Sequence, residues 1–258
     1  MSLEGRVAVV TGGGRGIGAA AARALAGAGA AVAVAARTES EIEAVAEELR
    51  GAGVRAEAIP CDVTDEESVA GLARRAAGAL GPVDLVVHGA GAATSATLAG
   101  TGLETWERML RVNATGAFLV TRAFLPGMAE RGRGRIVHVA SVAGLSGARY
   151  IAAYAASKHA VVGLVRSAAA EVKGTDVTVN AVCPGYVDTA MTRESVERIA
   201  ETTGRSRGEA LEALLAQGRQ SRLIRPEEVA DAVAWLCGDA AGGVNGQALV
   251  LDGGALLA

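Results

Sequence analysis

Short apolar runs alternate along the chain with longer stretches of helical periodicity. Seven runs are predicted as β-strands, at Val7–Val10, Val32–Ala36, Ala56–Ile59, Val83–Val87, Ile136–Val139, Val177–Val182 and Leu249–Leu251. Most are apolar throughout, which is typical of strands that are buried on both faces of a parallel sheet. The β-α-β order implies right-handed crossovers and therefore a doubly wound α/β fold, with a seven-stranded parallel sheet and helices on both faces.

The helical stretches carry start signals, and one of them departs from the alternation. Thr38–Glu41 and Thr64–Glu67 each fit a capping box, and Pro226 followed by two glutamates suits a first helical turn. Residues 189–220 are helical and charged where the alternation expects a short link. We interpret this insertion as a helical lid over a substrate, with a surface helical excursion as the alternative.

Composition favours one domain and a small-molecule partner. Half of the 258 residues are hydrophobic and no seam divides the chain, so we expect a single domain over residues 1–258. A formal charge of −3 argues against a broad basic surface for nucleic acid or anionic lipid. The apolar runs are too short to span a membrane and no signal segment precedes the first strand, which predicts a cytoplasmic protein. Neither the three cysteines nor the three histidines have metal-ligand spacing, so no metal site is predicted.

A glycine-rich turn, Thr11–Gly18, follows the first predicted strand and opens an alanine-rich helix. Glycines let the backbone approach a pyrophosphate, and the helix N-terminus offers free N–H groups to the phosphates. The turn therefore predicts a dinucleotide site. Its spacing, Gly12-x-x-x-Gly16-x-Gly18, differs from the common G-x-G-x-x-G fingerprint. It resembles the turn of the short-chain dehydrogenase/reductase family, and this likeness runs from here to Leu251–Gly254, which implies a Rossmann-type fold and an NAD(P)-dependent oxidoreductase.

The second predicted strand ends in Ala36-Arg37, where dinucleotide folds that prefer NAD usually place an acidic residue. Arg37, together with Arg15 from the glycine turn, is suited to clamp the 2′-phosphate of NADP. We therefore favour NADP(H) over NAD(H). The alternative is that both arginines are merely solvated in an arginine-rich chain.

The resemblance implies further cofactor contacts at matching positions. Asp62 and Val63 match the family's adenine-contacting pair, although Asp62 equally suits the turn before Thr64. Pro184–Thr189 resembles the segment that packs on the nicotinamide face, with an ordinary Pro-Gly turn as the alternative. The full predicted cofactor set is Gly12, Arg15, Gly16, Ile17, Gly18, Arg37, Asp62, Val63, Ala90, Gly91, Tyr154, Lys158, Pro184, Gly185, Val187 and Thr189.

The fourth predicted strand leads into His88-Gly-Ala-Gly91, where the family has Asn-Asn-Ala-Gly. Ala90 and Gly91 fit the usual close approach to the cofactor. His88 and Gly89 depart from the pattern, which puts in doubt the local bracing that asparagine gives. We expect His88 to complete a structural hydrogen bond and not to take part in chemistry.

Tyr154 and Lys158 lie one helical turn apart, so both side chains share a helix face. Tyrosine, with an ordinary pKa near 10, is a poor base at neutral pH, and a nearby ammonium is expected to lower that pKa. Of 25 basic residues 23 are arginine, so a lysine at this position indicates a role beyond charge. Tyr150 has no lysine four residues later, and we assign it to the pocket wall or to packing.

The resemblance completes a catalytic set of Asn113, Ser141, Tyr154 and Lys158. Ser141 follows the fifth predicted strand and is expected to bind the substrate oxygen as charge develops there. Asn113 is expected to hold a water that links Lys158 to solvent. In this mechanism the nicotinamide gives a hydride to a carbonyl carbon and Tyr154 supplies the proton, while oxidation of the alcohol is the reverse.

The substrate is less well defined than the reaction. Asn180–Gly185 and Ser157–His159 resemble reductases of 3-oxoacyl thioesters and polyketide-type ketoreductases, which implies a 3-oxoacyl or 3-hydroxyacyl thioester. Four arginines of the insertion could meet a phosphate of such a substrate or be incidental: Arg193, Arg198, Arg205 and Arg207. Sugar, polyol or cyclic alcohol dehydrogenation is the alternative activity.

A hypothesis of another class is a dinucleotide-binding sensor or structural subunit without turnover. The complete catalytic set argues against this hypothesis, because a site that no longer catalyses a reaction does not need all four catalytic residues. Relatives are commonly tetramers built on the helices around Trp106–Met128 and Ala153–Val172 and the last strand, so the resemblance also implies a homotetramer.

Overall fold

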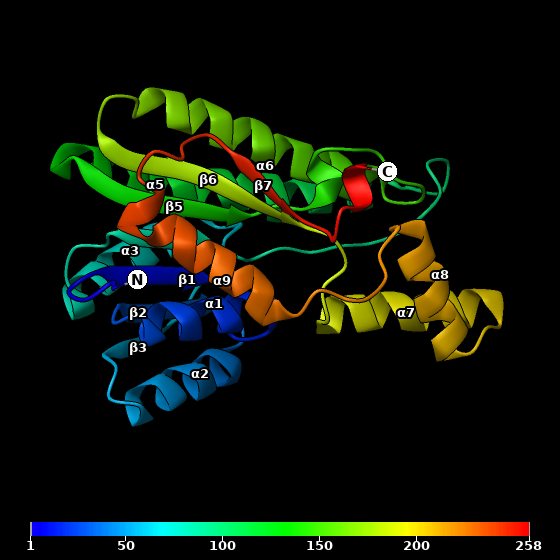
Figure 1. The fold of residues 1–258 in the computed structure, drawn as a ribbon, viewed down its shortest axis with the longest axis horizontal. Coiled ribbons are helices and arrows are strands. Elements are labelled where there is room, and N and C mark those ends of the chain that lie inside the picture. The colour runs from blue at the N-terminus through cyan, green and yellow to red at the C-terminus, as the bar shows by residue number, and fades with distance from the viewer. Residues whose placement is uncertain (1, 258) are drawn as a thin grey trace.

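Within residues 2–257, which the computed structural model describes, seven parallel strands form one sheet. The strands are β1 (Val7–Thr11), β2 (Ala31–Ala36), β3 (Ala56–Pro60), β4 (Leu85–His88), β5 (Arg133–Val139), β6 (Asp176–Pro184) and β7 (Ala248–Leu251). Their order is β3-β2-β1-β4-β5-β6-β7 (Figure 1). All seven predicted strands and the doubly wound fold are thus confirmed. The order reverses between β1 and β4, and at such a reversal open parallel sheets bind ligands beyond the carboxyl ends of their strands.

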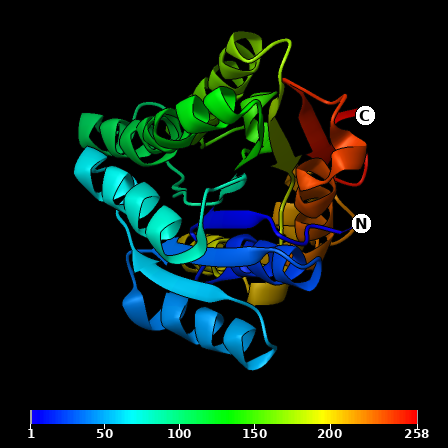
Figure 2. The same ribbon diagram turned by 90° about the vertical axis from the view of Figure 1, so that its left-hand side faces the viewer.

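Helices cover both faces of the sheet. They are α1 (Gly16–Gly27), α2 (Glu39–Gly51), α3 (Glu66–Leu80), α4 (Leu103–Met109), α5 (Gly116–Arg131), α6 (Ala152–Glu171), α7 (Ala190–Thr203), α8 (Arg207–Gln217) and α9 (Pro226–Cys237). One core cluster joins α3, α5 and α6 to the sheet, and the other joins α1, α2 and α9. Figure 2 shows the green helices α5 and α6 well apart from the blue helices α1 and α2. Because both faces are covered, Ala8, Val9 and Val10 of β1 are fully buried, which explains the unbroken apolar runs.

No helix in this part of the chain combines the length and the apolar character needed to cross a membrane.

The predicted capping box at Thr64 is wrong. The N-cap of α3 is Asp65, whose carboxylate accepts from the backbone N–H of Glu67 at 3.0 Å. Thr64 instead donates its hydroxyl to Asp62 at 2.8 Å. Because α3 begins one residue later than predicted, Asp65 and not Thr64 occupies the N-cap, and the Thr64 hydroxyl completes the turn at Asp62.

The capping box predicted at Thr38 is also wrong, although Thr38 does occupy the N-cap of α2. Its side chain makes no capping hydrogen bond, and α2 carries Glu39 and Glu41 in its first turn, where acidic charge suits the positive end of the helix dipole. The start of α9 is confirmed. Pro226 takes the first helical position, and Glu228 accepts from the backbone N–H of Arg225 at 2.8 Å.

The insertion is helical, as predicted, and forms α7 and α8 at the right of Figure 1. A capping box between Ser206 and Glu209 starts α8. The two helices share a small apolar cluster of their own around Val196, Ala210 and Leu214, separate from the two main clusters. The insertion is therefore stabilised mostly by contacts within itself.

A short neck joins this helical pair to the sheet. Val187 and Ile224 form a parallel bridge, with backbone bonds from Asp188 to Ile224 at 2.8 Å and from Ile224 to Tyr186 at 2.9 Å. The buried Gln220 side chain accepts from the N–H of Tyr186 at 2.6 Å and donates to its carbonyl at 3.3 Å. The incoming and outgoing segments are thus held together where they leave the sheet.

Candidate active site

The glycine turn forms a cradle of bare backbone at the carboxyl end of β1. Gly12 has a φ of +66°, and a Cβ there would lie 2.6 Å from the backbone nitrogen of Ala90. Gly18 packs against the carbonyl of Gly12, so neither position tolerates a side chain. Ile17 is partly buried against the core. This closeness of backbone at the N-terminus of α1 fits a dinucleotide pyrophosphate, which needs N–H groups and no side chains in its way.

The start of the 189–220 insertion, which we interpret as a lid, lies against this cradle. A Cβ on Gly16, whose φ is +55°, would come within 3.2 Å of the Thr189 side chain. Thr189 follows Pro184–Val187, where Gly185 donates its N–H to Leu251 at 3.0 Å and Val187 is buried. The structure therefore brings the predicted phosphate-binding turn and the predicted nicotinamide-side segment together.

The two arginines predicted for the 2′-phosphate are both exposed. Arg15 lies 3.9 Å from the carboxylate of Glu41, with 68% of its side chain accessible. Arg37 follows β2 and lies close enough to Asp62 for its charge to lower the pKa of that carboxyl. Both arginines are therefore free to reach a ligand, although Glu41 already shares Arg15. The spacing of Arg15 and Glu41 along the chain does not indicate this contact.

Asp62 takes the turn role that the sequence left open. One carboxylate oxygen accepts from both the N–H and the hydroxyl of Thr64, at 2.9 and 2.8 Å, and the backbone bond is the main cause of its lowered pKa. Val63 is buried, and a Cβ on Gly116 would lie 3.0 Å from it. The pair thus stands between β3 and α5 at the ligand-binding edge.

Lys158 is buried at the same edge, on α6. Its amine donates to the carbonyl of Val139 at 2.9 Å and lies 5.8 Å from the ring centre of Tyr154. A Cβ on Gly91 would lie 3.6 Å from that amine. Burial lowers the pKa of Lys158 to about 8, because a desolvated ammonium is less stable than a hydrated one.

The expected lowering of the Tyr154 pKa is not what the structure has. Burial raises the pKa of Tyr154, and the nearby Ser141 hydroxyl only partly offsets this. The reason is that the Lys158 amine is directed at the Val139 carbonyl and not at the phenol, so desolvation outweighs charge. The phenol is accordingly held in its protonated form.

Asn113 lies in a π-helical turn, Leu110–Thr115, between α4 and α5. Its amide accepts from the N–H of Ala92 and donates to the Ala92 carbonyl, each at 2.9 Å, and donates to Ser157 at 2.9 Å. Ser157 in turn donates to the carbonyl of Tyr154 at 2.7 Å. Such turns often occur at functional sites. Asn113 therefore braces both the segment after β4 and the helix that carries Tyr154, which the sequence did not indicate.

Two tyrosines flank the site in different ways. Tyr186, which sequence reasoning missed, is half-buried, and its proximity contributes to the raised pKa of Tyr154. Its place directly after Pro184-Gly185 was an available signal. Tyr150 is 48% exposed with a φ of +70°, beside the guanidinium of Arg149. It therefore lies at the rim and is not a packing residue.

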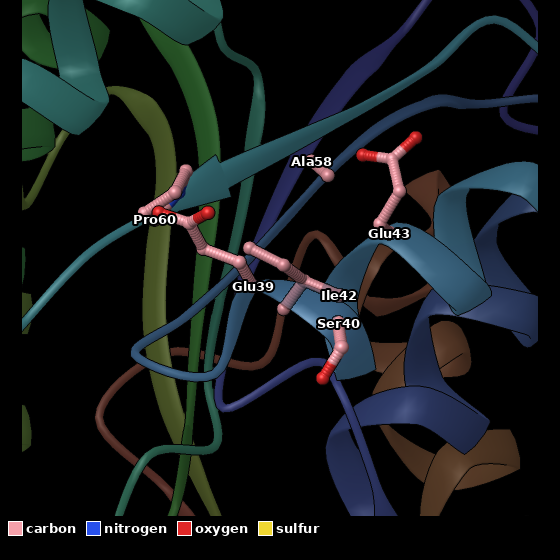
Figure 3. A pocket seen from close by; sticks show the side chains of 6 residues that line it. All are labelled: Glu39, Ser40, Ile42, Glu43, Ala58 and Pro60. Carbon is pink, nitrogen blue, oxygen red and sulfur yellow. The ribbon is translucent and has the colours of Figure 1, made fainter.

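A separate hollow of about 400 Å³ lies at the outer edge of the sheet (Figure 3). It is lined by Glu39, Ser40, Ile42, Glu43, Ala58 and Pro60, from α2 and β3. Residues predicted for the cofactor or for catalysis are not among those that line it. The candidate active site is therefore the edge built by the glycine turn, Gly91 and Lys158.

Comparison with known proteins agrees with this geometry. The 3-oxoacyl-acyl-carrier-protein reductase of Thermotoga maritima is 32% identical over 257 residues, covering 100% of both chains. The cis-4-hydroxycyclohexanecarboxylate dehydrogenase of Sinomonas cyclohexanicum is 42% identical over 211 residues, covering 81% of this chain and 80% of the relative. A crystal structure of a variant actinorhodin polyketide ketoreductase with NADPH superposes with a TM-score of 0.93 at 39% identity, covering 99% of each chain.

The model of the family described as short chain dehydrogenase matches residues 6–200, which include the glycine turn, Asn113, Ser141, Tyr154 and Lys158. That span is most of the chain, and the relatives above are similar over four fifths of its length or more. The chain therefore belongs to the short-chain dehydrogenase family and is an oxidoreductase.

Proposed function

We propose that the protein interconverts a ketone and a secondary alcohol with NADP(H), using Tyr154 as acid and base. One observation carries the proposal. Ala90 lies against Gly12 of the cofactor cradle, while a Cβ on the next residue, Gly91, would lie 3.6 Å from the Lys158 amine and 3.1 Å from Asn113. A dinucleotide on the glycine turn would thus extend toward the proposed catalytic set.

When bound, the nicotinamide supplies the hydride. Tyr154 gives its proton to the substrate oxygen, and the raised pKa of its phenol suits this acid role because the proton is in place when a ketone arrives. Ser141, buried beside the phenol, donates a hydrogen bond to the same oxygen as negative charge develops there. Lys158, with a pKa of about 8, is mostly charged at neutral pH and stabilises the phenolate that remains. Asn113 holds a water that links Lys158 to solvent, and the proton returns to the site through this water.

The preference for NADP(H) is supported by Arg15 and Arg37, which are both exposed at the edge where the 2′-phosphate would lie. The ketoreductase that superposes on this chain was crystallised with NADPH. We expect Arg37→Ala to weaken NADPH binding about tenfold and to leave NADH binding unchanged, since one charge-assisted contact to phosphate is lost. Fluorescence titration with both cofactors measures the difference, and equal weakening of the two would contradict the assignment.

For the substrate we propose a 3-oxoacyl thioester. The full-length likeness to a 3-oxoacyl reductase supports this class. Among the arginines of the insertion, Arg193 is paired with Asp188 and Arg207 with Glu197, whereas Arg198 donates to the Ser95 hydroxyl in the segment after β4, at 3.4 Å. Arg198 is therefore placed to meet a phosphate. The second candidate, a cyclic or sugar-type alcohol, is favoured by the 42% identity to a hydroxycyclohexanecarboxylate dehydrogenase.

The test is to incubate the protein with NADPH and a panel of 3-oxoacyl thioesters, cyclic ketones and keto sugars, and to measure the consumption of NADPH by its absorbance. We expect turnover on thioesters, which Tyr154→Phe reduces by about 10²–10⁴-fold while NADPH still binds. Turnover confined to cyclic or sugar ketones would select the second candidate. Cofactor binding without turnover on any compound would favour a non-catalytic sensor.

We also propose that the protein is a homo-oligomer. Large apolar side chains lie exposed on the elements expected to pair, with Trp106 36% and Phe118 45% accessible on α4 and α5. Val250 of the last strand is 38% accessible. Light scattering after size exclusion measures the mass, and a monomer at micromolar concentration would contradict the proposal.

A further inference from the structure

Three adjacent strands place polar residues in one row beneath Lys158. Thr11 of β1 is the register partner of His88 of β4, and His88 is the partner of His138 of β5. All three side chains are buried, at 2% exposure or less. Thr121 of α5 closes the row, since its hydroxyl lies 3.0 Å from His138 Nε2.

Hydrogen-bond chemistry fixes one tautomer at the α5 end of the row. The Thr121 hydroxyl donates its only proton to the carbonyl of Ala117 at 2.8 Å. It therefore accepts from His138, so the proton of that ring is on Nε2. His138 Nδ1 is left as a bare acceptor, and it has no hydrogen-bond partner among the described residues.

A matching gap lies on the neighbouring ring. His88 Nδ1 lies 2.9 Å from the Thr11 hydroxyl, while His88 Nε2 is buried without a hydrogen-bond partner in the described part of the chain. The two ring centres are 5.4 Å apart in an edge-on arrangement. An N–H···N bond of about 2.9 Å, with each nitrogen roughly 1.1 Å from its ring centre, gives a separation of about 5 Å. The ring separation is therefore compatible with a hydrogen bond between the two unpartnered nitrogens.

We propose that His88 and His138 are positioning residues, neutral imidazoles protonated on Nε2 that form one directed hydrogen-bonded chain from Thr11 through both rings to Thr121. In this chain the Thr11 hydroxyl donates to His88 Nδ1, and His88 Nε2 donates to His138 Nδ1. Every buried polar atom of the row is then satisfied, as buried groups in proteins generally are.

The electrostatic surroundings keep both rings neutral. Burial lowers the pKa of His88 well below its usual value and that of His138 to about 3, and the nearby Lys158 charge acts in the same direction. The other groups facing the pair are neutral hydroxyls from β1 and α5. A neutral pair is what an N–H···N bond between imidazoles requires, because one ring has to accept.

The hydrogen-bonded row from Thr11 to Thr121 connects three segments of the site. Thr11 directly precedes Gly12, and its carbonyl accepts from the N–H of Gly89 at 3.0 Å. His88 leads into Gly91, and His138 precedes Val139, whose carbonyl holds the Lys158 amine. This bracing takes the place of the asparagines expected at 88 and 89. The hydrogen-bonded chain stands on geometry alone, while its importance for turnover rests on the proposed function.

Nitrogen NMR on histidine-labelled protein tests the chain directly, because the sequence has three histidines and His159 on α6 is exposed. We expect both buried rings to show Nε2–H at neutral pH, with a scalar coupling between His88 Nε2 and His138 Nδ1. His159→Gln assigns the reference signal. Protonation of His88 on Nδ1, a charged ring at neutral pH, or no coupling between the rings would overturn the proposal.

Phenylalanine substitutions test the positioning role, since Phe keeps ring shape and removes both nitrogens. We expect His88→Phe and His138→Phe each to lower kcat/KM about tenfold, and the double variant to lose little more than either alone. The alkaline limb of the pH profile should shift too, as the Val139 carbonyl that holds Lys158 moves. Additive losses or an unmoved profile would reduce the pair to a structural role. A wild-type protein with the NMR coupling but no turnover would instead refute the proposed function and leave the chain intact.

Discussion

The floor of the candidate site and its lid are built on opposite principles. On the floor, Asn113 and Lys158 are buried and held by hydrogen bonds of 2.9 Å to backbone atoms of neighbouring elements. In the lid, α7 and α8 share only a small apolar cluster, and the Arg207–Glu197 ion pair joining them is exposed. Burial and saturated hydrogen bonds make a group costly to move, whereas exposed ion pairs contribute little.

Under the proposed function, we infer separate tasks for the two regions from this difference. A proton donor has to stay within hydrogen-bond reach of the substrate, so the floor needs a single geometry. A lid has to let substrate in and out, and segments that open are drawn from the less stable part of a protein. Substitutions on the floor should therefore reduce kcat, and those in the lid should mostly change KM.

The largest expected effect is on the floor, at Lys158. We expect Lys158→Met to lower kcat by about 10²–10³-fold, because the charge that stabilises the phenolate is lost. In the wild type, activity in the reducing direction should fall as the pH rises through about 8, since the ammonium then loses its proton. Steady-state kinetics from pH 6 to pH 9 measure both. Lys173, the other lysine, is exposed, so Lys173→Met is the matched control and should leave the pH profile unchanged.

The next effect concerns stability, through the buried histidines. Their folded-state pKa values are lowered, so below pH 6.5 the unfolded chain takes up protons that the folded chain refuses. Stability is therefore fully present above pH 6.5 and is lost as the pH falls. Between pH 6.5 and pH 5 each ring should cost about 1.5 kcal/mol of unfolding free energy. The carboxyls with lowered pKa values, such as Glu48 and Glu228, act below this window.

Urea unfolding at several pH values measures this loss. The variant His138→Phe should lose about half as much stability as the wild type over the same window, because one of the two titrating rings is gone. Identical pH dependence in the two proteins would show that the rings take up protons while folded.

A smaller effect is expected at the neck of the lid. Gln220→Leu removes the acceptor for the Tyr186 N–H and the donor to its carbonyl. We expect KM for the substrate to rise about tenfold with little change in kcat, since one net hydrogen bond is worth about 1 kcal/mol and a bare N–H costs more. Amide exchange should quicken over residues 190–217 and stay unchanged in the sheet. Gln217→Leu is the control, because Gln217 is exposed and, among the described residues, its side chain makes only a 3.5 Å bond to the Arg149 carbonyl. A fall in kcat alone would place Gln220 on the floor.

The fold could be read from the sequence because two-sided burial leaves a plain pattern. The apolar run predicted at Val7–Val10 corresponds to β1, and the charged helical stretch at 189–220 corresponds to α7 and α8. The hydrogen-bond partners of short polar side chains could not be predicted in this way. Thr64 and Asp65 are both able to cap α3, and the spacing of residues does not reveal that Asp65 takes this position while Thr64 bonds Asp62.

The sequence predicted that Tyr154 and Lys158 lie on one side of a helix, but not the hydrogen bonds that surround them. Tyr154 and Lys158 share a helix face, as their spacing indicates, but the direction of the Lys158 amine depends on a carbonyl 19 residues away in β5. The amine is thus not directed at the phenol and burial raises the pKa of Tyr154, so the electrostatic expectation was wrong although the two residues were placed together. Likewise, a polar His138 inside an apolar strand was a visible signal, yet only the strand register pairs it with His88.

The smallest effects should come from the lid surface, where they separate the two substrate classes. The Arg207–Glu197 pair is 2.7 Å long, but the arginine side chain is 79% exposed, so Arg207→Gln should change stability by less than about 0.5 kcal/mol and leave KM unchanged.

Arg198, which donates to Ser95, should behave differently from Arg207 if the substrate carries a phosphate, because its guanidinium would then bind that phosphate. Arg198→Gln should then raise KM about threefold for a phosphopantetheine thioester and leave KM unchanged for the same acyl group on a short, uncharged thiol. Only the phosphopantetheine substrate carries a phosphate, and this phosphate loses its ion-pair partner in the variant. The difference should shrink at high salt. Equal KM changes for both thioesters would show that Arg198 holds the segment after β4 and does not bind the phosphate.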